Sequence, residues 1–227
     1  MPKRSDRDSR RSRKPRGRSV GTRRERAGTV LIVTEGEKTE PNYFKGVKKD
    51  VESAQAGVVD IMVPVIEVKG TGQSTSKLVE QAERILQRSG KVYSEVWIVC
   101  DADDFPDLDE AKQRARAEGM GFVWSNRSFE LWLLLHFENC EVAYTSRQLF
   151  ERLDRTLRQK GFGGYDKARE DIYRVLKQNG DINRAMSRAK LLREMHGEQK
   201  VESHPSQCDP CTTVDELVTH LLGFCSV

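Results

Sequence analysis

The most informative stretch of the sequence is Val96-Trp97-Ile98-Val99-Cys100-Asp101-Ala102-Asp103-Asp104. Apolar and β-prone residues run without polar alternation into three carboxylates. This pattern predicts a buried parallel strand, because helices cover both faces of such a strand. Ligands of open α/β sheets bind beyond the carboxyl ends of the strands. The three carboxylates are therefore expected at a binding edge of the sheet.

The spacing of these carboxylates suits a metal ion. Asp101 and Asp103 are two positions apart and point to the same side of an extended chain. Their mutual repulsion would be relieved by a divalent cation such as Mg²⁺, which prefers oxygen ligands. Asp104 is a further candidate ligand. The alternative is a solvated turn in which an aspartate caps the next helix near Asp107.

A second apolar strand also ends in a carboxylate, in the run Thr29-Val30-Leu31-Ile32-Val33-Thr34-Glu35-Gly36-Glu37. A helix is predicted to follow as far as Glu52, with Thr39 as its N-cap. Lys38 lies beside this helix N-terminus, where backbone N–H groups attract anions. We therefore assign Lys38 a phosphate contact, with a solvated lysine as the alternative.

The order of predicted elements indicates an α/β fold. Strands expected at about 28–34, 59–68, 96–101 and 119–125 alternate with helices, which predicts a mostly parallel four-stranded sheet flanked by helices. Lys69 opens a polar loop at the end of the second strand and is a candidate nucleic-acid contact. Its glycines lack the ending of a P-loop. From Thr145 onward the pattern is helical, with segments at about 146–159, 166–178, 181–196 and 213–223.

The stretch Ser125-Asn-Arg-Ser-Phe-Glu-Leu-Trp-Leu-Leu-Leu-His-Phe137 predicts an apolar helix capped by Ser125 or Ser128. Glu130 would lie in its first turn, where the helix dipole favours a carboxylate. The functional alternative makes Glu130 a third metal or water ligand facing Asp101 and Asp103. His136 lies six residues after Glu130 and so on another face, which favours a core histidine.

Charge divides the 227 residues unevenly. Residues 1–26 contain twelve Lys or Arg and three Asp or Glu, a net charge of +9, so the remainder carries −5. We interpret 1–26 as a disordered basic arm, either contacting nucleic acid or only solubilising the chain. Residues 27–140 are expected to form the α/β domain, and 141–227 a helical extension packed on it.

Cysteine content and hydropathy indicate a cytoplasmic protein without a membrane span. No run approaches the roughly 20 apolar residues that a transmembrane helix needs, and the N-terminus lacks the apolar region of a signal peptide. Cys208 and Cys211 have zinc-site spacing, but one pair cannot complete a four-ligand site. Two free thiols in a loop are therefore expected there.

Four motifs together resemble the RloB-like family, a Toprim-related group of bacterial restriction and abortive-infection loci. They are Glu35-Gly-Glu-Lys-Thr-Glu-Pro-Asn-Tyr, Asp101-Ala-Asp103, the Ser125–Phe137 block and Gly164-Tyr-Asp-Lys167. The resemblance covers about residues 28–222. Arg127 stands where the block is expected to have proline, and adds positive charge. The region 208–213 resembles the family's Asn-Pro-Ser-Thr-Thr turn only loosely.

The resemblance implies a Toprim-type nuclease site that uses Mg²⁺ or Mn²⁺ on DNA or on RNA such as tRNA. By motif, Glu35 would be the acid/base or metal-binding glutamate, and Asp101 and Asp103 would hold the metal. Glu130 would complete the acidic cluster, while Arg127 and Lys167 are candidate phosphate contacts. The family also implies a partner ATPase of the AAA or ABC type and a role in anti-phage defence.

Two other functions remain open from the sequence. One is a non-catalytic subunit whose acidic pocket binds metal or nucleotide within a defence complex. The other is a nucleotidyl transferase like the primase Toprim domains, although no template- or zinc-binding module is recognisable. Whether the chain forms a homo-oligomer is open as well.

Overall fold

The computed structural model describes residues 28–54, 65–72, 75–102 and 107–225. The predicted basic arm at 1–26 lies outside the described residues. So do Asp103 and Asp104, and most of the segment at 59–68 that was assigned to the second strand.

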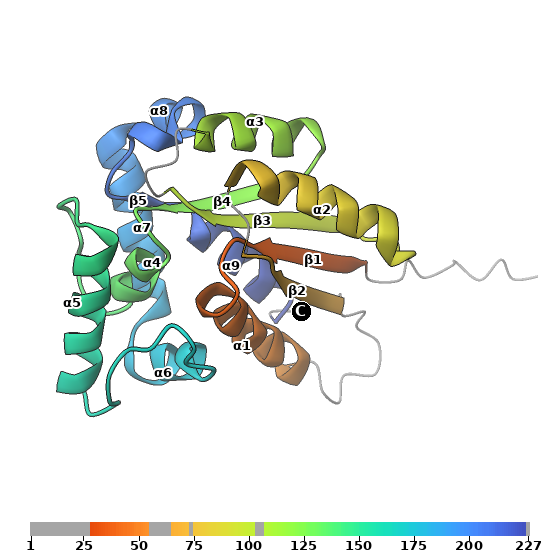
Figure 1. Cartoon of the computed structure of the whole chain (residues 1–227). Helices are drawn as coiled ribbons and strands as arrows, with labels where there is room; N and C mark the ends of the chain where they lie inside the picture. The colour runs from red at the N-terminus through yellow and green to blue at the C-terminus, as the bar shows by residue number, and fades with distance from the viewer. Residues whose placement is uncertain (1–27, 55–64, 73–74, 103–106, 226–227) are drawn as a thin grey trace, which may run out of the picture.

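A five-stranded sheet of order β2-β1-β3-β4-β5 forms the centre of the fold (Figure 1). Its strands are β1 (Thr29–Thr34), β2 (Val65–Gly70), β3 (Glu95–Asp101), β4 (Gly121–Asn126) and β5 (Cys211–Thr212). The first four strands are parallel to one another, which confirms the predicted α/β class. β5 is antiparallel to β4 and was not predicted, because the chain after residue 145 was expected to be helical. A two-residue strand leaves no periodicity to detect.

Helices cover both faces of the sheet. Figure 1 shows α1 (Thr39–Ala54) and α9 (Val214–Gly223) on one face, and α2 (Thr75–Ser89) and α3 (Leu108–Ala117) on the other. β1 is buried on both sides: Ile32 packs in the core with Phe44 of α1, whereas Leu31 packs in the opposite core with Leu78 of α2. This explains the uninterrupted apolar run of the strand.

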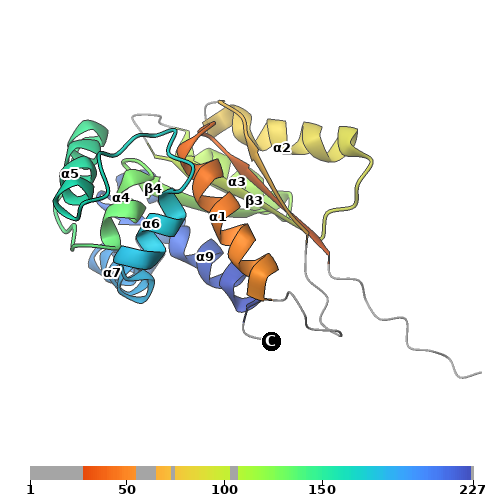
Figure 2. The same ribbon diagram turned by 90° about the horizontal axis from the view of Figure 1, so that it is seen from below.

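The remaining helices gather at the end of the sheet toward which the parallel strands run (Figures 1 and 2). They are α4 (Glu130–Leu135), α5 (Ser146–Gln159), α6 (Ile172–Asn179), α7 (Ile182–His196), α8 (Glu198–Ser203) and the 3-10 turn η1 (Pro205–Gln207). Trp132, Leu153 and Leu176 belong to the same apolar core as Phe44. The segment after residue 140 thus shares one core with the sheet.

Most predicted helix boundaries agree with the structure to within two residues. The exception is α6, which begins at Ile172 rather than near residue 166. Asp166 Oδ1 accepts a hydrogen bond from the N–H of Ala168 at 2.9 Å, and the residues from here to Asp171 form turns before the helix begins. None of the helices in the described ranges has the length and apolar character needed to cross a bilayer.

Candidate functional site

A cavity of about 310 Å³ opens at the carboxyl ends of β1 and β3. These strands are neighbours, and the chain leaves β1 for β2 on one side before returning to β3 on the other. Such a reversal of strand order creates the crevice in which open α/β sheets bind ligands. The cavity is lined by Glu35, Gly36, Glu37, Lys38, Thr39, Glu40, Gly72, Asp101, Phe129, Glu130 and Lys167.

The sheet wall of the cavity consists of Glu35 and Asp101. The N–H of Glu35 donates to the carbonyl of Val99 at 2.9 Å, which extends the pairing of β1 with β3 by one residue. Glu35 Oε2 accepts hydrogen bonds from the N–H of Asp101 at 3.3 Å and from Thr75 Oγ1 at 3.2 Å. Both predicted carboxylate residues therefore line the same cavity, as expected for neighbouring parallel strands that end at one edge of the sheet.

The helical wall consists of Glu40 and Glu130 with their partners Tyr165 and Lys167. The Glu130 side chain is only 3% exposed at the start of α4. Its Oε1 accepts a hydrogen bond from the Tyr165 hydroxyl at 3.0 Å and lies 3.5 Å from Lys167 Nζ. Burial and the neighbouring Glu130 carboxylate raise the pKa of Tyr165 far above its ordinary value, so its hydroxyl remains a donor.

Lys167 stays charged in this setting. Its partial burial alone would lower the pKa of the ammonium group, but the carboxylates of Glu130 and Asp101 outweigh that effect and the pKa is raised. Lys167 thus presents a fixed positive charge to both walls of the cavity.

Glu40 lies in the first turn of α1 and lines the cavity, although the sequence did not single it out as a site residue. It is 5% exposed, and its Oε1 accepts a hydrogen bond from the N–H of Gly36 at 3.0 Å. Burial raises the pKa of Glu40, backbone hydrogen bonds lower it less, and the nearby Glu130 raises it further. The signal in the sequence was the spacing Gly36-x-x-x-Glu40, which lets a first-turn carboxylate reach back to a strand end.

Gly36 has a steric role in this arrangement. A Cβ added at Gly36 would lie 2.3 Å from Glu40 Oε2, closer than real Cβ atoms come to any atom. A side chain at Gly36 would therefore displace the Glu40 carboxylate from the position in which it accepts the Gly36 N–H.

Besides Lys167, three predicted phosphate-binding residues lie in three different places. Lys38 is exposed and lines the cavity together with Lys167. Lys69 lies at the end of β2 and lines a separate groove. Arg127 Nε donates to Asp209 Oδ2 at 3.1 Å, and Arg127 is not among the residues that line the cavity.

Two predicted helix caps are wrong. α1 begins at Thr39 itself, whose hydroxyl donates to the carbonyl of Lys167 at 3.2 Å and so ties the helix to the Tyr165–Lys167 turn. Ser125 lies in β4 and Ser128 precedes α4, but α4 has Phe129 at its N-cap position and no side-chain cap. Tertiary contacts recruited the Thr39 hydroxyl, which local sequence cannot reveal.

His136 is buried in the core, which confirms the prediction of a core histidine. Its Nδ1–H donates to the carbonyl of Trp132 at 3.0 Å, and burial lowers the pKa of the imidazole to about 4. The ring is therefore neutral near pH 7.

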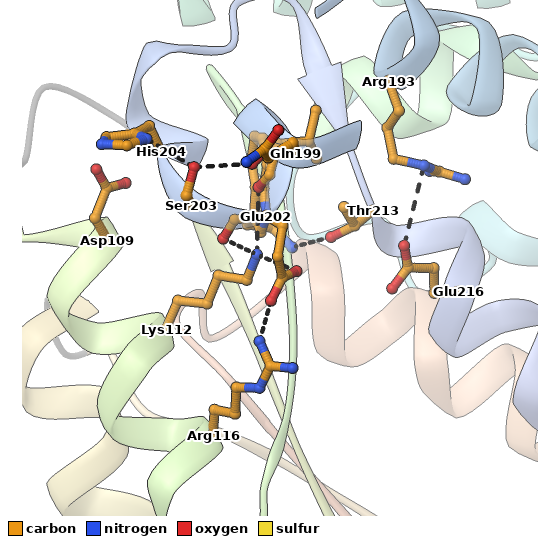
Figure 3. Close-up of polar contacts among 12 residues, drawn as sticks. Asp109, Lys112, Arg116, Arg193, Gln199, Glu202, Ser203, His204, Thr213 and Glu216 are labelled. Carbon is orange, nitrogen blue, oxygen red and sulfur yellow. Dashed lines mark hydrogen bonds and ion pairs between the residues drawn. The ribbon is translucent and has the colours of Figure 1, made fainter. Parts of the chain in front are cut away.

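Contacts with α8 fix α3, the helix that follows the Asp103 segment (Figure 3). Lys112 Nζ donates to the carbonyls of Val201 at 3.2 Å and Glu202 at 2.8 Å, and to Glu202 Oε2 at 2.9 Å. Arg116 also pairs with the Glu202 carboxylate. The C-terminal half of the chain thus anchors the helix that leads away from Asp101.

The thiols of Cys208 and Cys211 are buried in the apolar core on the α2 and α3 side of the sheet, and Cys208 Sγ donates to the carbonyl of His204 at 3.6 Å. In the described ranges, no group of three or more His, Cys, Asp or Glu side chains is arranged to hold a metal ion. The carboxylate oxygens of Glu35 and Asp101 nevertheless suit Mg²⁺ chemically. Two further oxygen donors assigned to that ion, Asp103 and Asp104, lie outside the described residues.

The fold and the site define an α/β protein with a carboxylate-lined cavity at the switch point of a mostly parallel sheet. The chain belongs to the family described as RloB-like protein, whose sequence model matches residues 30–221. No curated protein and no solved structure matches the chain. Every residue that lines the cavity falls inside the matched range.

Proposed function

We propose that the chain is a Mg²⁺- or Mn²⁺-dependent Toprim-type nuclease that hydrolyses phosphodiester bonds of DNA or RNA in bacterial anti-phage defence. The observation that supports this most strongly is the convergence of Glu35, Asp101 and Glu130 on one cavity at the switch point. These three carboxylates come from three separate motifs: two from neighbouring strand ends and one from the start of α4. Membership of the RloB-like family agrees with the proposal.

The residues divide into metal-binding and substrate-binding roles. Glu35 and Asp101 would hold the metal together with Asp103 and Asp104. When bound, the metal would polarise the phosphodiester and supply an activated water. Lys167 would offset the negative charge of the phosphate, since its ammonium group already faces the cavity beside Glu130. Lys38 would contact phosphate at the rim.

Glu130 would serve as a positioning group for Lys167 and Tyr165. A buried carboxylate needs hydrogen-bonded partners, and here it has a hydroxyl and an ammonium group. The resulting network fixes the lysine that approaches the phosphate. A partner ATPase, as the family resemblance implies, would control the reaction.

The alternative is a non-catalytic subunit that binds metal or nucleotide in the same cavity. It uses the same carboxylates, since the binding of a cation by Glu35 and Asp101 does not by itself require hydrolysis. In that case Glu35 and Asp101 would recognise a bound cation without hydrolysis.

A cleavage assay separates the two functions. Labelled plasmid, single-stranded DNA and total tRNA would be incubated with the full-length chain and Mg²⁺ or Mn²⁺, with and without the partner ATPase. We expect metal-dependent cleavage that is lost in Asp101→Ala/Asp103→Ala and kept in Glu110→Gln, which removes an exposed carboxylate from α3. The absence of cleavage under every condition would contradict the nuclease and favour the subunit.

A further inference from the structure

A second hollow, which we call the basic groove, runs between β2 and α2 and has a volume of about 540 Å³. It is lined by Glu67, Lys69, Gly70, Thr71, Gln81, Arg84, Ile85, Arg88, Ser89, Lys91 and Tyr93. β2 is the edge strand of the sheet, so nothing beyond it in the described part of the structure closes this side.

The charge of the groove is opposite to that of the cavity. Among the described residues, four cations and one carboxylate line the groove, whereas five carboxylates and two lysines line the cavity. Part of the positive charge is already balanced: Arg84 pairs with Glu80 at 3.3 Å, and Lys91 pairs with Glu67.

Lys69 and Arg88 supply charge that is not held in a salt bridge within the described residues, although the Glu67 carboxylate, two residues before Lys69, interacts with it electrostatically. Both side chains are exposed, and neither is in a salt bridge with a carboxylate of the described residues. One comes from the end of β2 and the other from the last turn of α2. Two such cations on opposite sides of a groove suit a polyanionic backbone.

The groove and the cavity meet at one turn. Gly70 and Thr71 line the groove, and the next residue, Gly72, lines the cavity. The turn is fixed to the sheet wall, because Thr71 N–H donates to Thr34 O at 3.2 Å and Gly72 N–H donates to Glu35 O at 2.9 Å. A strand lying along the groove would therefore reach Glu35 within a short distance of chain.

We propose that the basic groove binds the sugar-phosphate backbone of a nucleic-acid strand next to the phosphate that enters the acidic cavity. This inference rests on the proposed nuclease function and assigns it a substrate path along the edge of β2. Tyr93 lines the groove as a half-buried aromatic residue, on which a base can stack without sequence preference. Phosphate contacts and stacking together predict binding that depends on salt but little on sequence.

The test measures binding of the full-length chain to a labelled single strand by fluorescence anisotropy in EDTA, at about 50 to 200 mM salt. The variant Lys69→Ala/Arg88→Ala removes two cations from the groove. Its matched control, Arg155→Ala/Lys200→Ala, removes two exposed cations from α5 and α8, away from β2 (Figure 1). The predicted arm at 1–26 and the net charge are the same in both variants.

We expect the groove variant to bind about five- to tenfold more weakly than the control, with a salt slope shallower by about 1.4. Equal affinities in the two variants would overturn the groove, even if the wild type cleaves with Mg²⁺, and would leave the nuclease proposal intact. A wild type that neither binds nor cleaves any nucleic acid would overturn the proposed function, and the groove with it.

Discussion

The two walls of the acidic cavity hold their carboxylates in different surroundings. On the sheet wall, Glu35 and Asp101 are partly exposed, and the Glu35 carboxylate accepts hydrogen bonds from a backbone N–H and a threonine hydroxyl. On the helical wall, Glu40 and Glu130 are buried; Glu40 accepts from the N–H of Gly36 four residues earlier, whereas the partners of Glu130 are distant in sequence. The sheet wall thus presents partly exposed carboxylate oxygens to the cavity, whereas burial on the helical wall favours the protonated form of Glu40, and Glu130 pairs with Lys167.

The largest expected effect comes from the sheet wall. Asp101→Asn keeps the size of the side chain but removes the charge that would attract a divalent cation. We expect metal-dependent cleavage to fall by at least about a hundredfold while the melting temperature stays close to that of the wild type. Cleavage rates at several Mg²⁺ concentrations measure this. Glu110→Gln, on the exposed side of α3, is the control and should cleave normally. Unchanged cleavage by Asp101→Asn would remove Asp101 from the site.

The next effect concerns the stability of the helical wall. Tyr165→Phe deletes a hydroxyl that donates to Glu130 at 3.0 Å, and the Glu130 side chain is 3% exposed. We expect the free energy of unfolding to fall by about 2 kcal/mol, because a buried carboxylate loses a donor that water cannot replace. Urea unfolding monitored by circular dichroism measures the change.

Tyr93→Phe is the matched comparison for this loss. Its hydroxyl also donates to a carboxylate at 3.0 Å, but that carboxylate, Glu67, is 18% exposed. We expect Tyr93→Phe to lower the free energy of unfolding by less than about 1 kcal/mol, since water can take the place of the hydroxyl at Glu67. If the two variants lose the same stability, burial of the accepting carboxylate does not decide the cost of losing the hydroxyl at Glu130.

The sheet wall could be predicted from the sequence because strand ends carry their own signal. Apolar runs that stop at Glu35 and Asp101 fix both the strand and the edge at which its carboxylate emerges. In a parallel sheet, neighbouring carboxyl ends meet without any information about side-chain contacts. The other two parallel strands and most helices were predicted from apolar runs and from helical spacing of apolar residues.

The helical wall could be predicted only in part. Glu130 and Lys167 were proposed from motif resemblance, but their ion pair and the Tyr165 hydroxyl depend on how α4 and the 165–168 turn pack together. Glu40 appeared to be an ordinary first-turn residue, because its burial follows from the helices that cover it. The strand β5 was not predicted for a related reason: its two residues are extended because they pair with β4, not because of a local preference.

The pH dependence of stability is a further test of the helical wall. The pKa of Glu40 is raised mainly by burial, so the folded state favours its protonated form. The stabilisation due to this proton is fully present below the ordinary pKa of glutamate and is lost as pH rises through the raised value. We therefore expect the stability of the wild type, relative to Glu40→Gln, to decrease from acid toward neutral pH.

Urea unfolding of both proteins across this pH range measures the difference. The glutamine variant is neutral at every pH, so the comparison cancels carboxylates elsewhere whose pKa is lowered, such as Asp154 and Asp171. A difference in stability that is constant or grows with pH would show that the pKa of Glu40 is not raised in the folded protein, and would contradict the preference for its protonated form.

The smallest effects are expected outside the cavity, where α8 supports the helix that follows Asp101. Lys112 and Arg116 both pair with Glu202, but Lys112 is 14% exposed and also donates to two backbone carbonyls, whereas Arg116 is 75% exposed. We expect Lys112→Ala to lower the free energy of unfolding by about 1 kcal/mol, because those carbonyls lose a charged donor. Arg116→Ala should change it by less than about 0.5 kcal/mol, since solvent screens an exposed pair. Denaturant unfolding of the two variants side by side measures this. If Lys112→Ala were also close to neutral, the contacts between α3 and α8 would contribute nothing to holding the sheet wall, and the register of β3 in the sheet would have to position Asp101 alone.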